Sequence, residues 1–169
     1  LAKNKKIDTM TSYFNFQNSK KILLNYGKAD ILYGANVFNH VDDNFDFLKG
    51  AYNLLKKDGK LILEVPDLKS LVSKIGFDTI YHEHRHYYSE KSVNKILKKQ
   101  GFKIFKLERI NYMSGSIRVF AQKKNIVRKK NIELSSVSLK EFLIFKKKIK
   151  IIKNEINLFI QKNLDKKNK

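Results

Sequence analysis

Two short apolar runs, with a helical segment between them, restrict the fold of this chain more than any other feature. The runs Asp30–Asn36 and Lys60–Val65 have the length and the apolar content of buried parallel strands. Asp42 or Asp43 can cap the segment between them. Its apolar side chains recur at helical spacing and stop before Lys56–Gly59: Phe45, Leu48, Ala51 and Leu55. A strand, a helix and a strand in this order predict a right-handed parallel crossover.

The chain after the second run predicts a helix followed by two antiparallel strands. Ser89 or Ser92 can cap a helix that ends at Gly101. The apolar runs Phe102–Ile110 and Ile117–Gln122 are joined by a short polar turn, so we expect them to form a hairpin. The predicted fold class is therefore α/β, with parallel strands that end in an antiparallel hairpin.

A long helix is predicted after the sheet. Ser138 and Glu141 have the spacing of a capping box, which begins a helix. The apolar residues that follow step by three and four, as in a helix-packing seam: Phe142, Phe145, Ile149, Ile152, Ile156 and Phe159. Such a seam suits either self-association or docking against a domain outside this chain, and we favour docking.

Composition excludes several classes of protein. The chain has no cysteine, which excludes disulfides and thiolate zinc sites and gives no reason to expect an oxidising compartment. No apolar run approaches the roughly 20 residues that span a bilayer, so we expect a cytoplasmic protein without membrane contact. The net charge of +20 comes mainly from lysines spread along the whole chain. This spread indicates a compositional bias of the source genome, and we expect no nucleic-acid partner.

The segment Gly76–Ser89 concentrates groups that can accept, donate or relay a proton. Its sequence, GFDTIYHEHRHYYS, holds three of the four histidines of the chain. Histidine titrates near neutral pH and is the usual general base, and a neighbouring carboxylate can fix its tautomer. Because His82, His84 and His86 alternate, the same segment would present three metal ligands on one face if it were extended.

Three motifs occur in an order that resembles one enzyme family. The segment Ala35–Val41, ANVFNHV, with the DDNFDFLKG that follows, resembles the post-strand motif of class I S-adenosylmethionine-dependent methyltransferases. Phe77–His84, FDTIYHEH, resembles the hallmark of sugar C-methyltransferases that act on nucleotide-linked 4-keto-6-deoxysugars, and Gly115–Phe120, GSIRVF, resembles a downstream motif of the same family. The resemblance covers residues 7–122, and the FDTIYHEH motif is its most specific part.

This resemblance implies a partial Rossmann-like class I methyltransferase sheet and S-adenosylmethionine as the cofactor. It also implies an internal fragment, in which residues 1–126 are the C-terminal part of the methyltransferase domain. Residues 127–169 would then be a helical extension or a linker to a missing C-terminal domain. The family carries zinc in an N-terminal domain that this chain lacks, so we assign no metal ligand. The expected partner is a small nucleotide-sugar substrate.

The resemblance also assigns roles to individual residues. His84 matches the family's general base and would remove the proton beside the ketone, so that the resulting carbon nucleophile attacks the methyl group of the cofactor. Glu83 would orient a ring or hold a sugar hydroxyl. Tyr81 would donate to the enolate oxygen. His40, at the carboxyl end of its strand, would reach the same crevice.

Two further residues are expected to bind ligands, and two alternatives stay open. Asn36 would lie near the methionine part of the cofactor, and Arg118 would bind a substrate phosphate. Tyr87 and Tyr88 are expected to be packing aromatics. One alternative function is a His-rich metal-binding module or a basic module that binds anions or nucleic acid. The other is an O- or N-methyltransferase on the same scaffold, because a base that deprotonates carbon also serves a hydroxyl.

Overall fold

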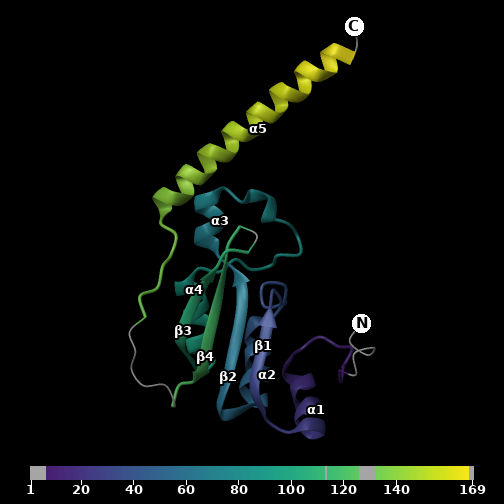
Figure 1. Ribbon diagram of the computed structural model, residues 1–169, viewed down its shortest axis with the longest axis vertical. Helices are drawn as coiled ribbons and strands as arrows, with labels where there is room; N and C mark the ends of the chain where they lie inside the picture. The colour runs from purple at the N-terminus through teal and green to yellow at the C-terminus, as the bar shows by residue number, and fades with distance from the viewer. Residues whose placement is uncertain (1–6, 113, 126–131, 168–169) are drawn as a thin grey trace.

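The computed structural model describes residues 7–112, 114–125 and 132–167, in which helices and strands are followed by a long last helix (Figure 1). In chain order they are α1 (Phe16–Tyr26), β1 (Ala29–Ala35), α2 (Asn44–Leu54), β2 (Leu55–Pro66), α3 (Leu68–Lys74), the 3₁₀ turn η2 (Phe77–Thr79), α4 (Glu90–Lys99), β3 (Phe102–Ile110), β4 (Ser116–Lys123) and α5 (Leu139–Lys167). From β1 onward the predicted order of strands and helices is confirmed, and α3 is an element within it that the sequence analysis did not predict.

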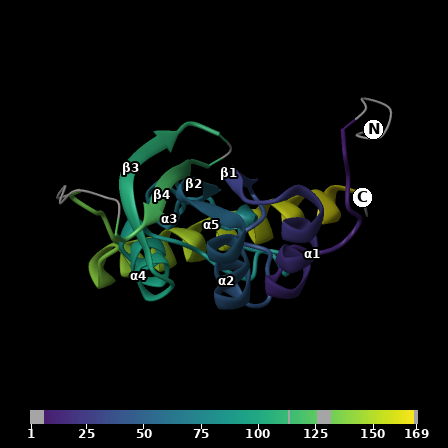
Figure 2. The same cartoon turned by 90° about the horizontal axis from the view of Figure 1, so that it is seen from below.

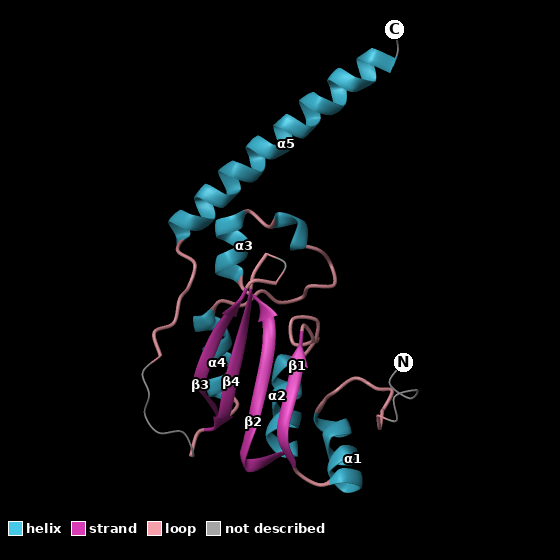
Figure 3. Cartoon of the chain, viewed as in Figure 1, coloured by secondary structure: helices cyan, strands magenta, loops and turns pink. Residues whose placement is uncertain are grey.

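The four strands form one mixed sheet in the order β1-β2-β4-β3. Strands β1 and β2 are parallel and are joined through α2, whereas β4 is antiparallel to both β2 and β3. This arrangement confirms the predicted α/β class. The turn between β3 and β4 and the segment after β2 both lie at the end of the sheet to which β1 and β2 point (Figure 3).

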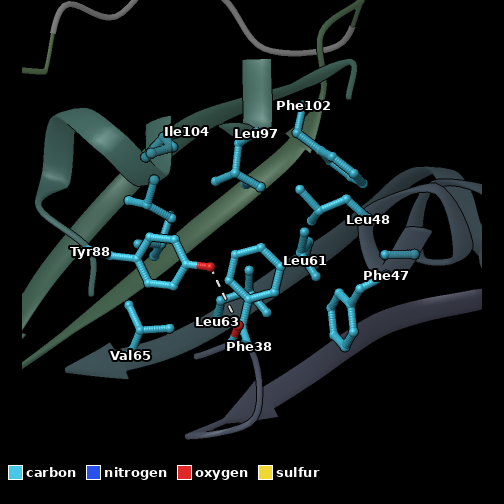
Figure 4. Packing of buried hydrophobic residues seen from close by; sticks show 14 of the residues in the cluster. Phe38, Phe47, Leu48, Leu61, Leu63, Val65, Tyr88, Leu97, Phe102 and Ile104 are labelled. Atoms are coloured by element: carbon cyan, nitrogen blue, oxygen red, sulfur yellow. Dashed lines mark hydrogen bonds between the residues drawn. The ribbon is translucent and has the colours of Figure 1, made fainter. Parts of the chain in front are cut away.

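The core lies between the sheet and the helices α2 and α4, which cover the same face (Figure 2). The buried side chains come from both layers: Phe47, Leu48 and Ala51 from α2, Val93 and Leu97 from α4, and Leu61, Leu63, Val65, Ile117, Val119 and Ala121 from the strands. Burial of this apolar surface is the main force that holds the two layers together. Figure 4 shows Phe38 and Tyr88 at the centre of this cluster.

Strand β1 is parallel to β2 as predicted, but the expectation that it is buried is wrong. Ile31 and Tyr33 are 57% and 56% exposed. Alternation along the strand turns Leu32 toward the core and turns both of these side chains to the opposite face. Among the described residues β1 pairs only with β2, so it is an edge strand with one open face.

Helix α2 ends one residue earlier than its predicted apolar stripe. Asp43 is the cap, because its carboxylate accepts hydrogen bonds from the backbone amides of Phe45 and Asp46. Phe45 is exposed, however, and Phe47 takes the buried position. Leu55 is the first residue of β2 rather than the end of the helix.

Helix α5 begins as predicted, with Ser138 and Glu141 in a reciprocal cap. Its first turns pack on α3, and its remaining length projects away from the sheet (Figure 1). Phe159, near the far end, is 70% exposed. None of the helices in the described ranges has both the length and the apolarity needed to cross a bilayer. The predicted domain boundary at residues 126–127 lies outside the described residues and stays a prediction.

Candidate active site

A cavity of about 260 Å³ lies at the carboxyl ends of β1 and β2. Crevices at this edge of open α/β sheets are the usual place for ligands. Three segments far apart in sequence meet here, namely the turn after β1, the loop between α3 and α4, and the turn between β3 and β4. The lining residues are Asn36, His40, Pro66, Asp67, Leu71, Thr79, Tyr81, His84, Tyr112, Ser114, Gly115 and Ser116. Four of the predicted site residues therefore share one cavity: Asn36, His40, Tyr81 and His84.

The imidazole of His84 is fixed in one tautomer by its neighbours. Its Nδ1 lies 2.8 Å from the carbonyl oxygen of Thr79. A carbonyl can only accept a hydrogen bond, so Nδ1 must carry the proton and, in the neutral ring, Nε2 carries the lone pair. The hydroxyl of Tyr81 donates to this Nε2 at 3.0 Å, and the two rings are 4.2 Å apart between centroids. His84 can therefore take up a proton at Nε2.

His40 reaches the same cavity from the turn that follows β1. The turn is closed by a hydrogen bond from the His40 amide to the Val37 carbonyl. Nδ1 of His40 donates to the carbonyl oxygen of Glu83 at 2.8 Å. The rings of His40 and His84 lie 4.9 Å apart between centroids. Asn36, at the start of this turn, has a left-handed backbone conformation with φ of 51°, which asparagine tolerates better than most residues.

Glu83 enters this arrangement through its backbone. The carbonyl oxygen of Glu83 holds His40, whereas its side chain is exposed and makes no hydrogen bond or ion pair with any residue of the described ranges. A carboxylate in this state is free to meet a ligand, but it does not orient either imidazole ring in this structure. The carbonyl group of Glu83 orients His40, and contact of its carboxylate with a sugar hydroxyl stays a prediction.

His82, His84 and His86 alternate in the sequence, but their side chains do not share one face in the structure. His82 is exposed, while Nε2 of His86 donates to the carbonyl oxygen of Val41 at 3.0 Å. His84 points into the cavity. Within the described ranges, no three His, Asp or Glu side chains converge in a way that could hold a metal ion.

Arg118 lies on the open face of the sheet and does not line the cavity. Its Nε and Nη2 atoms donate to Oε2 of Glu64 at 3.1 and 2.9 Å, and Nη1 lies 3.5 Å from Oε2 of Glu108. The hydrogen bond to Glu64 raises the pKa of Arg118 above its ordinary value. Contact between Arg118 and a substrate phosphate stays a prediction, and it requires the guanidinium group to leave Glu64.

Several cavity residues were not identified from the sequence. Thr79 contributes a backbone carbonyl, and such a group has no signature in a sequence. Ser114 and Gly76 bring two loops into close approach, since a Cβ atom on Gly76 would lie 2.6 Å from Oγ of Ser114. A glycine at such a position is the one signal that could have pointed to this contact. Leu71 lies on α3, which was itself unpredicted.

A second hollow of about 410 Å³ adjoins the first at His40. Phe14, Val37 and Phe47 give it apolar walls. Its three acidic side chains already have partners: Asp43 caps α2, Asp46 accepts from the Phe16 amide, and Asp42 pairs at 2.6 Å with Arg85, which lines the same hollow. His40 lines both hollows.

The chain is similar to several known proteins. A curated relative, the C-methyltransferase NovU of Streptomyces niveus, is 32% identical over 121 residues, which are 72% of this chain and 29% of NovU. The chain thus spans less than a third of the length of that relative. Among solved structures, magnesium protoporphyrin IX methyltransferase (ChlM) from Synechocystis PCC 6803 with bound SAH is 19% identical with a TM-score of 0.44, covering 63% of this chain and 57% of that one.

A SAM-dependent methyltransferase from Anabaena variabilis ATCC 29413 is 14% identical with a TM-score of 0.48, and the match covers 65% of this chain and 55% of that one. The profile of the family described as "Methyltransferase domain" matches residues 4–107. That match covers more than half of the 169 residues and includes β1, β2 and the whole histidine segment. The chain therefore belongs to the methyltransferase domain family.

Proposed function

We propose that this chain forms the substrate-facing part of an S-adenosylmethionine-dependent methyltransferase that methylates a carbon atom next to the ketone of a nucleotide-linked deoxysugar. The observation that carries the proposal is the pair formed by His84 and Tyr81, with an unprotonated ring nitrogen and a phenol hydroxyl 3.0 Å apart at one cavity. The 32% identity to a C-methyltransferase supports carbon as the acceptor. Residues 1–126 would be part of the methyltransferase domain, and 127–169 an extension of it.

The residues at the cavity fit the proposed cofactor. Asn36 lines the cavity next to His40, and its backbone amide is fixed by a 2.9 Å hydrogen bond to the Glu64 carbonyl. A fixed asparagine of this kind would hold the methionine part of the cofactor. When bound, S-adenosylmethionine supplies an electrophilic methyl group.

The protein's own part in the reaction is to make a carbon nucleophile. His84 Nε2 takes the proton from the carbon beside the ketone, and the Thr79 carbonyl stabilises the protonated ring by holding Nδ1–H. This step requires that Tyr81 first turns its hydroxyl from Nε2 to the ketone oxygen. That movement frees the lone pair of Nε2 and places a donor where the enolate charge develops, which lowers the energy of that charge. His40, whose Nδ1–H is held by the Glu83 carbonyl, lies close enough to contact the same sugar.

Proton exchange tests this proposal on the chain itself. In D₂O the wild-type chain should catalyse deuterium incorporation at the carbon beside the ketone of a nucleotide-linked 4-keto-6-deoxysugar, measured by NMR. His84→Asn should lower the exchange rate by roughly 10²–10⁴-fold, the usual contribution of a positioned base. The matched control is His82→Asn, which changes an exposed histidine two residues away and should leave the rate unchanged.

Two outcomes would contradict the proposal. One is a wild-type exchange rate no higher than that of buffer, and the other is an unchanged rate in His84→Asn. Addition of methyl-¹³C-labelled S-adenosylmethionine then identifies the methylated atom in the product. A label on oxygen or nitrogen would favour the alternative O- or N-methyltransferase.

A further inference from the structure

Tyr87 connects the candidate base to a part of the chain that lies outside the matched family region. Its ring packs against a second apolar cluster, formed by Leu71 and Val72 of α3 and Phe145 of α5. Its hydroxyl donates to the carbonyl oxygen of Thr79 at 3.4 Å. Its ring also meets that of His84 edge-on, with centroids 6.1 Å apart at an interplanar angle of 78°.

The Thr79 carbonyl is thus the point at which Tyr87 and His84 meet. The oxygen accepts Nδ1–H of His84 at 2.8 Å as well as the Tyr87 hydroxyl, one for each lone pair. The Thr79 side chain turns away and donates to the Gly76 carbonyl at 2.7 Å. The Tyr87 hydroxyl occupies one lone pair of the Thr79 carbonyl oxygen, and the Tyr87 ring is held by packing. The other lone pair is left to accept Nδ1–H of His84 from one direction.

Helix α5 contributes a side chain to the cluster against which Tyr87 packs. Phe145 is 9% exposed and is the residue of α5 that is buried in the second cluster, with Ile149 packed beside it. The segment before α5 is attached to the domain as well, because the Ser135 amide donates to the buried carboxylate of Glu90 and the Ser135 carbonyl accepts from the Lys91 amide. Residues 135–149 are therefore attached to the domain at Glu90, at Lys91 and at the second cluster, whose Leu71 also lines the cavity.

We propose that Tyr87 is a positioning residue for His84, and that Phe145 of α5 holds Tyr87 in place. The inference rests on the proposed role of His84 as the base. In this arrangement the hydroxyl of Tyr87 keeps the Thr79 carbonyl directed at Nδ1–H, so that the lone pair stays on Nε2, toward the cavity. A tyrosine that served only for packing would need its ring and not its hydroxyl, so Tyr87→Phe separates the two roles.

The test measures the ring nitrogens of His84 by ¹⁵N NMR in the complete 169-residue chain, at a pH where the ring is neutral. In the wild type, Nδ1 should show the shift of a protonated nitrogen and Nε2 that of an unprotonated one. Tyr87→Phe should move the two shifts toward each other, because the alternative tautomer becomes populated. Phe145→Ala should do the same, and Phe145→Leu, which keeps an apolar contact, should restore most of the wild-type separation.

Two control variants separate positioning from a general loss of stability. Phe159→Ala removes an exposed ring from the same helix and should leave both nitrogens unchanged. Ile104→Ala opens a cavity in the main core, away from the second cluster, and should lower stability without changing the tautomer. Wild-type shifts in Tyr87→Phe would overturn the inference, as would equal shifts in Phe145→Ala and Ile104→Ala.

The deuterium-exchange rate provides the second readout. Tyr87→Phe should lower the maximal rate about tenfold with little change in the substrate concentration for half-maximal rate, since a misdirected base slows the step more than it weakens binding. The NMR result does not depend on turnover. Altered tautomers with no exchange in the wild type would therefore leave the positioning inference standing and reject the proposed function. Unchanged tautomers in Tyr87→Phe, together with exchange in the wild type, would reject the positioning inference alone.

Discussion

Tyr88 shows how a single ionisable side chain is kept neutral in the core. It is 2% exposed, stacks on Phe38 with centroids 5.3 Å apart, and donates to the Phe38 carbonyl at 3.4 Å (Figure 4). Burial raises the pKa of Tyr88 well above that of a free tyrosine, and a hydrogen bond with Asn44 opposes this shift only in part. The neutral phenol fits this apolar site, and the phenolate does not.

The raised pKa of Tyr88 predicts a loss of stability in alkali. The unfolded state loses its phenol proton near pH 10, about the ordinary pKa of tyrosine, while the folded state keeps it. The contribution of Tyr88 is therefore fully present below about pH 10 and is lost as the pH rises from there toward the folded-state pKa. Urea midpoints should fall more steeply between about pH 9 and pH 11 in the wild type than in Tyr88→Phe. Tyr13→Phe, at a 92% exposed site, should follow the wild type.

Site residues that act through a side chain could be identified from the sequence, whereas those that act through the backbone could not. Tyr81, His84 and His40 belong to motifs whose positions relative to strand ends are regular, and the structure brings all three to one cavity. The Thr79 carbonyl was missed because it is a main-chain group. Tyr87 is predicted to be a packing residue, and its ring does pack. The sequence does not show that its hydroxyl donates to the Thr79 carbonyl.

At the scale of elements, local signals predicted most boundaries. Asp43, Ser89 and Ser138 each cap the helix that follows, and each forms its bonds with the first turn of that helix alone. Helix α3 is only seven residues long, yet Leu68, Leu71 and Val72 have helical spacing and Asp67 caps it, so the sequence carried signals that the prediction did not use. The exposure of β1 was unpredictable for a different reason. A buried strand and an edge strand can have the same apolar sequence, and which of the two forms depends on the strands and helices that pack beside it.

Glu90 connects two elements that are distant in sequence. It is the first residue of α4 and is fully buried. Its Oε1 atom lies 2.6 Å from Nη2 of Arg109 on β3, and its Oε2 atom accepts the Ser135 amide at 2.6 Å. A buried carboxylate needs such partners, because an unpaired charge away from water is costly. The start of a helix is also a favourable place for negative charge.

Removal of the Arg109 charge should therefore lower the free energy of unfolding more than removal of the Glu90 charge. Arg109→Met leaves the Glu90 carboxylate buried and unpaired, and should lower the free energy of unfolding by roughly 2 kcal/mol after allowance for the exposed side of the arginine. Glu90→Gln keeps an acceptor for the Ser135 amide and should cost less. The double variant should recover part of the loss. Urea unfolding measures all three, and an equal loss in both single variants would contradict the argument. Lys56→Met, which breaks an exposed pair with Asp30, should have little effect.

At the scale of the whole molecule, the excess of positive charge is the dominant electrostatic feature. The chain carries 36 Lys and Arg against 16 Asp and Glu. Most basic side chains whose exposure the structure describes are exposed, and α5 presents a dense row of them, including Lys147 and Lys150. Net charge far from zero keeps a protein soluble but destabilises the compact state, because like charges are closer together in the folded chain than in the unfolded one.

Salt should therefore stabilise this protein. Raising NaCl from about 10 mM to about 0.5 M shortens the screening length from roughly 30 Å to a few ångströms, which weakens repulsion between distant lysines more than it weakens contact ion pairs. We expect the urea midpoint at neutral pH to rise with NaCl. The double charge reversal Lys147→Glu and Lys150→Glu lowers the net charge by four, from +20 to +16, and should reduce the slope. A midpoint that falls with salt would mean that close ion pairs such as Arg118–Glu64 outweigh the long-range repulsion.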